Sequence, residues 1–337
     1  MSREQRRQVE RLLRESPLDI GGDVAVQRPI LERMMTAGTL PADVRASTAA
    51  IGGVPVLDIR IDGPDDGAVL LFLHGGGYAL GSAAAVAGLG AELARRARCR
   101  VVCVDYRLAP ENPFPAAVDD ALAVYRGLLD RGVPCGAVAV GGESAGGGLA
   151  VAAMLAARTA GLPQPAAVVV CSPWADLTVT GGTATTKAAV DPALTPDGLR
   201  RRAREYAGAV DPADPLLSPV FADLGGLAPL LIQVGSHEIL LDDAVRLAGR
   251  AAEQDVEVTL EVTPEVPHVF QGFAGILDEA GEALDRAAAF LRTHLDPTPA
   301  VSGPAPTVGE HDAAPSDADR PHRTVRSGPG WAAPSVP

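Results

Sequence analysis

A serine lies between two glycines in the segment Gly142-Glu-Ser-Ala-Gly146, at a predicted junction between a strand and a helix. The apolar run Ala137–Val140 before it is typical of a buried strand, and Ala145–Thr159 after it is typical of a helix. A G-x-S-x-G segment in this context forms a tight turn that exposes the serine, and its glycines leave room beside the turn. We therefore interpret Ser144 as a candidate nucleophile.

A serine hydroxyl is a weak nucleophile near neutral pH, so it requires a base and an acid that orients the base. Five histidines follow the serine in the chain: His237, His268, His294, His311 and His322. Of these, His268 alone lies in a loop between the last predicted strand and the last predicted helix. A base on that loop could reach the nucleophile, and we predict that His268 is this base.

The candidate acids lie in the segment 235–243, directly after the predicted strand Pro229–Val234. Glu238 falls in the loop itself, whereas Asp242 and Asp243 stand at a predicted helix start, where carboxylates are commonly caps. We predict that Glu238 is the acid, and we keep Asp242 as the alternative.

A second glycine-rich segment, His74-Gly-Gly-Gly-Tyr78, follows the apolar run Ala68–Leu73. Glycine lets the backbone turn sharply and lets a reacting group approach bare N–H groups, which acyl transfer needs opposite a developing oxyanion. Taken alone, the segment is equally typical of an ordinary turn. Its place before Ser144 in the chain favours the oxyanion interpretation, in which the Ala145 N–H at the helix N-terminus takes part.

Strand-like and helix-like runs alternate from residue 54 onward, which predicts an α/β fold with a mostly parallel sheet and helices on both faces. The predicted strands are Val54–Ile61, Ala68–Leu73, Arg100–Val104, Ala137–Val140, Ala166–Cys171, Pro229–Val234 and Val256–Val262. The predicted helices between them are Ala84–Arg98, Ala116–Arg131, Ala145–Thr159, Asp242–Gln254 and Leu277–Leu295. Sites in such sheets lie at the carboxyl ends of the strands, which is where Gly75, Ser144, Glu238 and His268 fall.

Three segments stand outside this alternation and define the expected domains. Residues 1–45 contain two predicted helices, 3–16 and 27–38, which are either a cap over a pocket or ordinary packing helices. Residues 46–296 are the expected catalytic domain, with an insertion at about 175–215 that is typical of a lid or cap and carries a helix near Asp197–Val210. Residues 297–337 are rich in proline and poor in core residues, and we expect this tail to be disordered.

Several motifs in combination are similar to those of a known family. They are His74-Gly-Gly-Gly-Tyr78, Asp105-Tyr-Arg-Leu-Ala-Pro-Glu111 with Pro113-Phe-Pro-Ala-Ala117, Gly142-Glu-Ser-Ala-Gly-Gly147, Ser172-Pro-Trp174 and Pro267-His-Val-Phe270. Through them, residues 25 to 295 resemble the bacterial hormone-sensitive-lipase-like carboxylesterases of the α/β-hydrolase superfamily. The resemblance implies an α/β-hydrolase fold with a helical cap and an oxyanion hole made by the N–H groups of Gly75, Gly76 and Ala145.

The acid departs from the family's pattern, which is more often an aspartate in an Asp-Pro-Leu-x-Asp segment. Here Glu238-Ile-Leu-Leu-Asp242 occupies that register, which favours Glu238. We interpret Asp105, Tyr106 and Arg107 of the matching stretch as structural, because acyl transfer offers them no step.

These residues together predict a serine hydrolase that cleaves carboxylic esters through an acyl-enzyme, with no cofactor and no metal. The family resemblance, together with the lack of a long apolar helix in the insertion 175–215, implies a preference for short acyl chains. A lactone, an amide or an acetylated metabolite could be opened by the same three residues. The family resemblance also includes gibberellin receptors, which lack the histidine, and a dehydratase group with threonine for the serine. The presence of His268 and Ser144 argues against both.

Composition limits the partners and the compartment. The formal net charge of −13 argues against nucleic acid and anionic membranes as partners. No run of apolar residues is long enough for a membrane span, and no apolar core follows the charged N-terminus, so we expect a cytoplasmic protein with buried, reduced cysteines. The sequence leaves the oligomeric state open, with a homodimer as one option.

Overall fold

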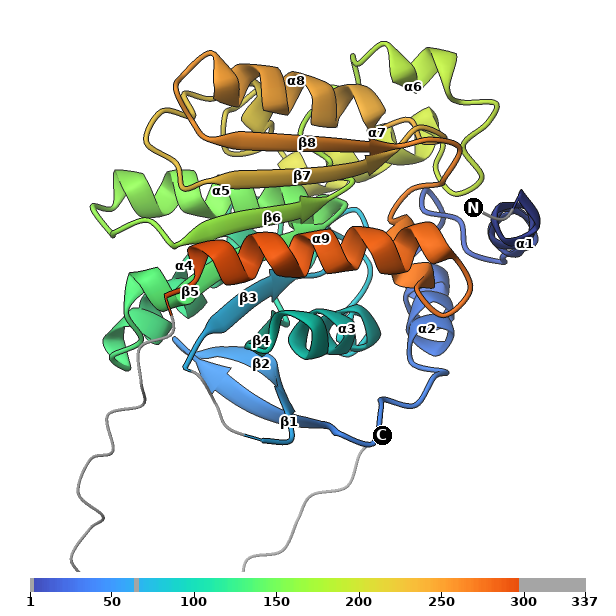
Figure 1. Ribbon diagram of the computed structural model, residues 1–337. Coiled ribbons are helices and arrows are strands. Elements are labelled where there is room, and N and C mark those ends of the chain that lie inside the picture. Colours follow the sequence, from blue (N-terminus) through green and yellow to red (C-terminus); the bar gives the residue numbers. More distant parts are fainter. Residues whose placement is uncertain (1–2, 64–66, 297–337) are drawn as a thin grey trace, which may run out of the picture. The chain divides into compact units, whose positions relative to one another are not determined.

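The apolar runs of the sequence form the central strands of one mixed sheet in the computed structural model, which describes residues 3–63 and 67–296 (Figure 1). The strand order is β1-β2-β4-β3-β5-β6-β7-β8, and the strands from β4 to β8 in that order pair in parallel. The strands are β1 Val44–Ile51, β2 Val54–Ile61, β3 Val69–Leu73, β4 Arg100–Val104, β5 Val138–Glu143, β6 Ala167–Cys171, β7 Leu230–Gly235 and β8 Val258–Thr263. The seven predicted strands are therefore confirmed, with ends that differ by at most three residues.

Strand β1 is absent from the sequence-based prediction. It pairs antiparallel with β2 through a turn at Gly52 and Gly53, whose φ angles of 59° and 83° suit glycine. Only the end residues Val44 and Ile51 are buried, and the six residues between them are exposed. An edge strand with so little burial has no alternation of apolar and polar residues that a sequence pattern could reveal.

Helices cover both faces of the sheet, as predicted. Two hydrophobic core clusters lie between the sheet and these helices, one on each face. The first is formed with α4, α5 and α8, and the second with α3 and α9 (Figure 1). The bounds are α3 Ala87–Ala97, α4 Ala116–Asp130, α5 Ala145–Thr159, α8 Leu241–Ala252 and α9 Asp278–His294. Helix α5 follows β5 directly, so the central strand of the sheet leads straight into the turn that carries Ser144.

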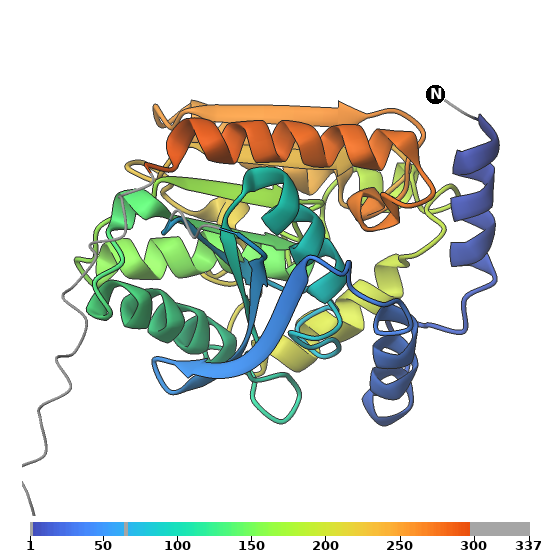
Figure 2. The same cartoon turned by 60° about the horizontal axis from the view of Figure 1, so that its bottom comes forward.

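The two N-terminal helices, α1 Arg3–Arg14 and α2 Val24–Met35, lie beside the strand ends that hold the predicted site (Figure 2). Two arginines attach this segment to the rest of the chain. Arg28 of α2 donates to the carbonyls of Ala79 and Ala109, each at 2.8 Å, and pairs with Glu111. The fully buried Arg202 donates to the carbonyl of Ile20 at 2.6 Å, between α1 and α2.

The insertion holds the short helix α6 Thr183–Thr186 and the helix α7 Pro196–Ala207. Helix α7 begins after Thr195, whose side chain accepts the Gly198 N–H, and it buries Leu199, Ala203 and Tyr206. The predicted tail 297–337 lies outside the described residues. Within the described ranges, we find no helix with the length and apolar character of a membrane span.

Candidate active site

Ser144 occupies the turn between β5 and α5 with a left-handed backbone, at φ 56° and ψ −124°. This conformation is unfavourable for a non-glycine residue, and its neighbours hold it. The Ser144 N–H donates to the carbonyl of Cys171, and the Ser144 carbonyl accepts the N–H of Trp174, both at 2.9 Å. A Cβ at Gly142 would lie 2.3 Å from the Gly146 oxygen, so the flanking glycine is sterically required.

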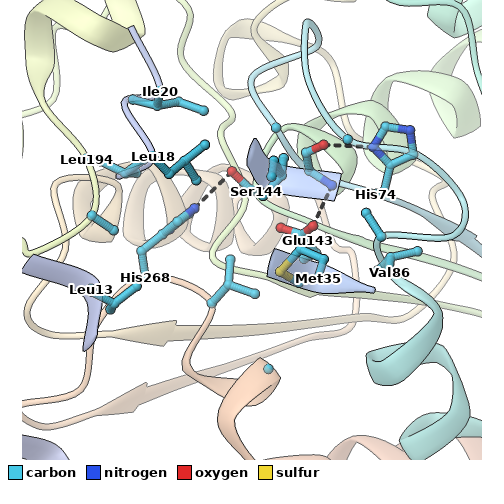
Figure 3. Close-up of a pocket in the computed structure, with 18 of the residues that line it drawn as sticks. Leu13, Leu18, Ile20, Met35, His74, Val86, Glu143, Ser144, Leu194 and His268 are labelled. Atoms are coloured by element: carbon cyan, nitrogen blue, oxygen red, sulfur yellow. Dashed lines mark hydrogen bonds between the residues drawn. The ribbon is translucent and has the colours of Figure 1, made fainter. Parts of the chain in front are cut away.

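His268 links the serine to a carboxylate in one chain of hydrogen bonds (Figure 3). Its Nε2 lies 2.9 Å from Ser144 Oγ, and its Nδ1 lies 2.7 Å from Glu238 Oε2. A carboxylate only accepts, so Nδ1 carries the proton and Nε2 is left to accept the serine hydroxyl. The loops after β5, β7 and β8 thus bring together the three residues that the sequence predicted.

The carboxylate of Glu238 is fully buried and held by two further donors. Its Oε1 accepts the Ser172 hydroxyl and the Gly235 N–H, each at 2.7 Å. Ser172 Oγ also accepts the Val269 N–H at 3.1 Å, so one hydroxyl contacts both the Glu238 carboxylate and the loop that carries His268. Sequence reasoning gave Ser172 no role, although its place just after β6 is a signal for a site residue.

The pKa of His268 reflects opposing effects. Burial alone lowers it, but attraction to Glu238, with smaller contributions from Asp191 and Glu143, outweighs burial and raises the pKa above its ordinary value. Asp191, from the insertion, was not found by sequence reasoning. Its carboxylate accepts the N–H groups of Leu194 and Ile239, at 2.9 and 2.8 Å, so it also joins the insertion to the loop that carries Glu238.

Asp242, the alternative acid, makes different contacts. Its Oδ2 accepts the Gly182 N–H at 3.0 Å, and its own N–H donates to Thr183 Oγ1 at 2.9 Å. The expectation that Asp242 caps its own helix is wrong, because α8 begins at Leu241 and its N-cap residue Leu240 makes no side-chain cap bond. Asp242 instead connects α8 to the start of α6 in the insertion.

The glycine run after β3 faces Ser144, but its N–H groups are not equivalent. The Gly75 N–H donates to Glu143 Oε1 at 2.5 Å and is therefore engaged by a side chain. Among the described residues, no acceptor is recorded for the N–H groups of Gly76 and Ala145. Two of the three predicted oxyanion donors are thus available, and the third has another partner.

The motif residues around the glycine run support its backbone. The Tyr106 ring stacks on His74 with centroids 4.1 Å apart, and its hydroxyl donates to the His74 carbonyl at 2.7 Å. Burial lowers the pKa of His74 to about 4, so this imidazole is neutral, and its Nδ1–H donates to the Gly75 carbonyl at 2.7 Å. Asp105 accepts the Ala83 N–H, and Arg107 pairs with Asp120. These contacts are structural.

A cavity of about 230 Å³ opens beside Ser144 and His268, and its lining is mainly apolar (Figure 3). The N-terminal helices and their connection contribute a large part of this lining: Leu13, Leu18, Ile20, Leu31 and Met35. The insertion adds Ala193 and Leu194, and the segment before α3 adds Ala85 and Val86. Glu143 is the acidic side chain that enters this lining. Within residues 3–63 and 67–296, no cluster of three or more His, Cys, Asp or Glu side chains could hold a metal ion.

Comparison with known proteins agrees with this fold. A family model described as the alpha/beta hydrolase fold matches residues 70–272. An acetyl-hydrolase of Streptomyces hygroscopicus is 50% identical over 228 residues, which cover 68% of this chain and 76% of that protein. The crystal structure of an esterase from the bacterial hormone-sensitive lipase family superposes with a TM-score of 0.85 at 42% identity, covering 88% of this chain and 100% of the other. The esterase EstE5, from a crystal soaked with p-nitrophenyl butyrate, superposes with a TM-score of 0.83 at 37% identity. The match covers 87% of this chain and 99% of that chain.

The chain therefore belongs to the α/β-hydrolase fold family. Within that family it is a bacterial carboxylesterase of the hormone-sensitive-lipase type.

Because Glu238 and Asp242 make different contacts, we expect opposite effects on activity when each carboxylate is replaced by the corresponding amide. Glu238→Gln should lower kcat about 10²–10⁴-fold, because an amide favours the wrong histidine tautomer and leaves the imidazolium uncompensated. Asp242→Asn should keep most of the activity, since an asparagine oxygen can still accept the Gly182 N–H. Both variants are compared on one short ester after circular dichroism has shown that they fold. An inactive Asp242→Asn beside an active Glu238→Gln would reverse the assignment.

Proposed function

We propose that the protein hydrolyses carboxylic esters of short acyl chains through an acyl-enzyme on Ser144. The observation that carries this proposal is the continuous chain of hydrogen bonds from Ser144 Oγ through His268 to Glu238, at the wall of an apolar cavity. A hydroxyl, an imidazole and a buried carboxylate in this order are the parts of nucleophilic acyl transfer.

In the acylation step, His268 Nε2 takes the hydroxyl proton as Ser144 Oγ attacks the ester carbonyl. The imidazolium that forms is stabilised by Glu238, whose carboxylate is already fixed by two donors and needs no reorganisation. The imidazolium then gives its proton to the departing alkoxide, and the acyl group remains on the serine as an ester. Water attacks this ester with His268 again as the base, which releases the acid and restores the serine.

The negative charge on the tetrahedral oxygen needs N–H donors, and we assign Gly76 and Ala145 to this role. Ala145 is the first residue of α5, so its N–H also lies at the positive end of a helix dipole. Loss of one such donor lowers kcat about 10²–10³-fold in other hydrolases. The Gly75 N–H can bind the oxyanion only if its hydrogen bond to the Glu143 carboxylate breaks, so we do not assign it as a donor.

The substrate class follows from the cavity and its walls. We infer that α1, α2 and residues 175–215 act as the cap, because they contribute much of the lining near Ser144. A cavity of about 230 Å³ with apolar walls suits a short acyl group better than a long lipid chain. The soaking of EstE5 with p-nitrophenyl butyrate gives a matching probe. The acetyl-hydrolase relative makes an acetylated metabolite the second candidate substrate for the same three residues.

Replacement of the nucleophile tests the reaction. Ser144→Ala should lower ester turnover about 10⁴-fold or more while the protein stays folded, because the acyl-enzyme can no longer form. Ser47→Ala, on the exposed face of β1, is the matched control and should turn over normally. If Ser144→Ala kept more than about one per cent of the control's kcat on p-nitrophenyl butyrate, the nucleophile would be another group.

Acyl length tests the cavity. We expect kcat/KM to be highest for acyl chains of about two to six carbons and to fall with longer chains, because the apolar space beside Ser144 fills. Rates are measured on p-nitrophenyl esters from acetate to dodecanoate, below the aggregation concentration of the longer esters. A higher kcat/KM on dodecanoate than on acetate and butyrate would refute the short-chain assignment.

A further inference from the structure

Glu143 is an acidic side chain in the cavity that the proposed reaction does not use. It is the last residue of β5 and directly precedes Ser144. Figure 3 shows its carboxylate turned toward the glycine run, with which it shares a hydrogen bond. Burial raises the pKa of this carboxyl, while the Gly75 N–H and the nearby His268 act in the opposite direction. Burial of a carboxylate in an apolar wall costs free energy unless the group is paired or hydrogen-bonded.

Gly75 has both a free space and an N–H donor for this carboxylate. Its N–H donates to Glu143 Oε1 at 2.5 Å, and a Cβ added at Gly75 would lie 2.3 Å from Oε2 of the same side chain. The missing side chain at Gly75 is therefore what allows the carboxylate to approach its N–H. This contact explains why the first residue of the run is a glycine, independently of any role in oxyanion binding.

Glu143 completes a set of contacts that fixes two successive peptide planes. In the plane between His74 and Gly75, Tyr106 holds the carbonyl and Glu143 holds the N–H. In the next plane, His74 Nδ1–H holds the Gly75 carbonyl. A trans peptide is planar and its N–H points opposite to its carbonyl, so this last contact sets the direction of the Gly76 N–H.

We propose that Glu143 is a positioning residue for ester hydrolysis: by holding the Gly75 N–H, it keeps the glycine run in the conformation that presents the Gly76 N–H to the oxyanion. The inference rests on the proposed function. Without Glu143, the plane between His74 and Gly75 keeps only its carbonyl contact, and its N–H must find another acceptor or rotate. The oxyanion site is then no longer preorganised when charge develops.

The charge of Glu143 gives a second, independent signature. Three carboxylates face His268: Glu143 from β5, Glu238 from the loop after β7, and Asp191 from the insertion, and each raises the pKa of the imidazole. The base must be neutral to accept the serine proton, so kcat/KM falls as pH drops through the pKa of His268. Removal of one anion lowers that pKa, and the acid limb of the pH profile moves to lower pH.

Two substitutions separate the hydrogen bond from the charge. Glu143→Ala removes both, and kcat on p-nitrophenyl butyrate should fall about 10- to 100-fold with KM changed less than about threefold, as for a misaligned oxyanion donor. Glu143→Gln removes the charge but keeps an oxygen that can accept the Gly75 N–H. It should recover most of the loss in kcat, while both variants show the acid limb at lower pH. Glu253→Ala, an exposed glutamate on the far end of α8, is the matched control.

Gly75→Ala provides a second route to the same contact. Its new Cβ would displace the carboxylate, so kcat should fall as in Glu143→Ala, and this variant decides the matter if Glu143→Ala does not fold. Wild-type kcat in Glu143→Ala or in Gly75→Ala would overturn the proposal, as would a Glu143→Gln variant with kcat as low as that of Glu143→Ala. Failure of the proposed function is distinguished because it would appear in Ser144→Ala, which would then retain turnover whatever the result at Glu143.

Discussion

The left-handed backbone of Ser144 is the constraint on which the rest of the site depends. At φ 56° this residue carries a strain of about 1–3 kcal/mol, which only a surrounding structure can hold. The central strand β5, the carbonyl of Cys171 and the N–H of Trp174 hold it. In return, the conformation lifts Oγ out of the turn and leaves the Ala145 N–H at the bare start of α5. The proposed nucleophile and the proposed oxyanion donor are thus placed by one strained residue.

Charge is the second organising feature, because several buried carboxylates converge on a single imidazole. Burial disfavours a charged histidine, yet the carboxylates reverse this effect and hold the pKa of His268 above its ordinary value. The strongest of these interactions is with Glu238, whose own position is fixed by Ser172 and Gly235. In the proposed mechanism, the imidazolium therefore meets fixed charges and dipoles rather than water, which is the condition for electrostatic preorganisation.

Local patterns in the sequence predicted the parallel strands and the residues Ser144, His268 and Glu238, because buried strands are continuous apolar runs and site residues follow them closely. The edge strand β1 was missed because its middle is exposed and its pairing is set by β2. The contact from Glu143 to Gly75 joins residues 68 positions apart, and Asp191 reaches His268 from the insertion. Such contacts arise from tertiary packing, and neither motif nor periodicity contains them.

Covalent labelling tests directly whether Ser144 is activated by His268 and Glu238, as we propose. The folded protein is treated with a fluorophosphonate, digested and mapped by mass spectrometry, with heat-denatured protein as the control. We predict a single label on the peptide that carries Ser144, no label on the denatured chain, and slower labelling of Glu238→Gln. A label on a different serine, or none on the folded protein, would contradict it.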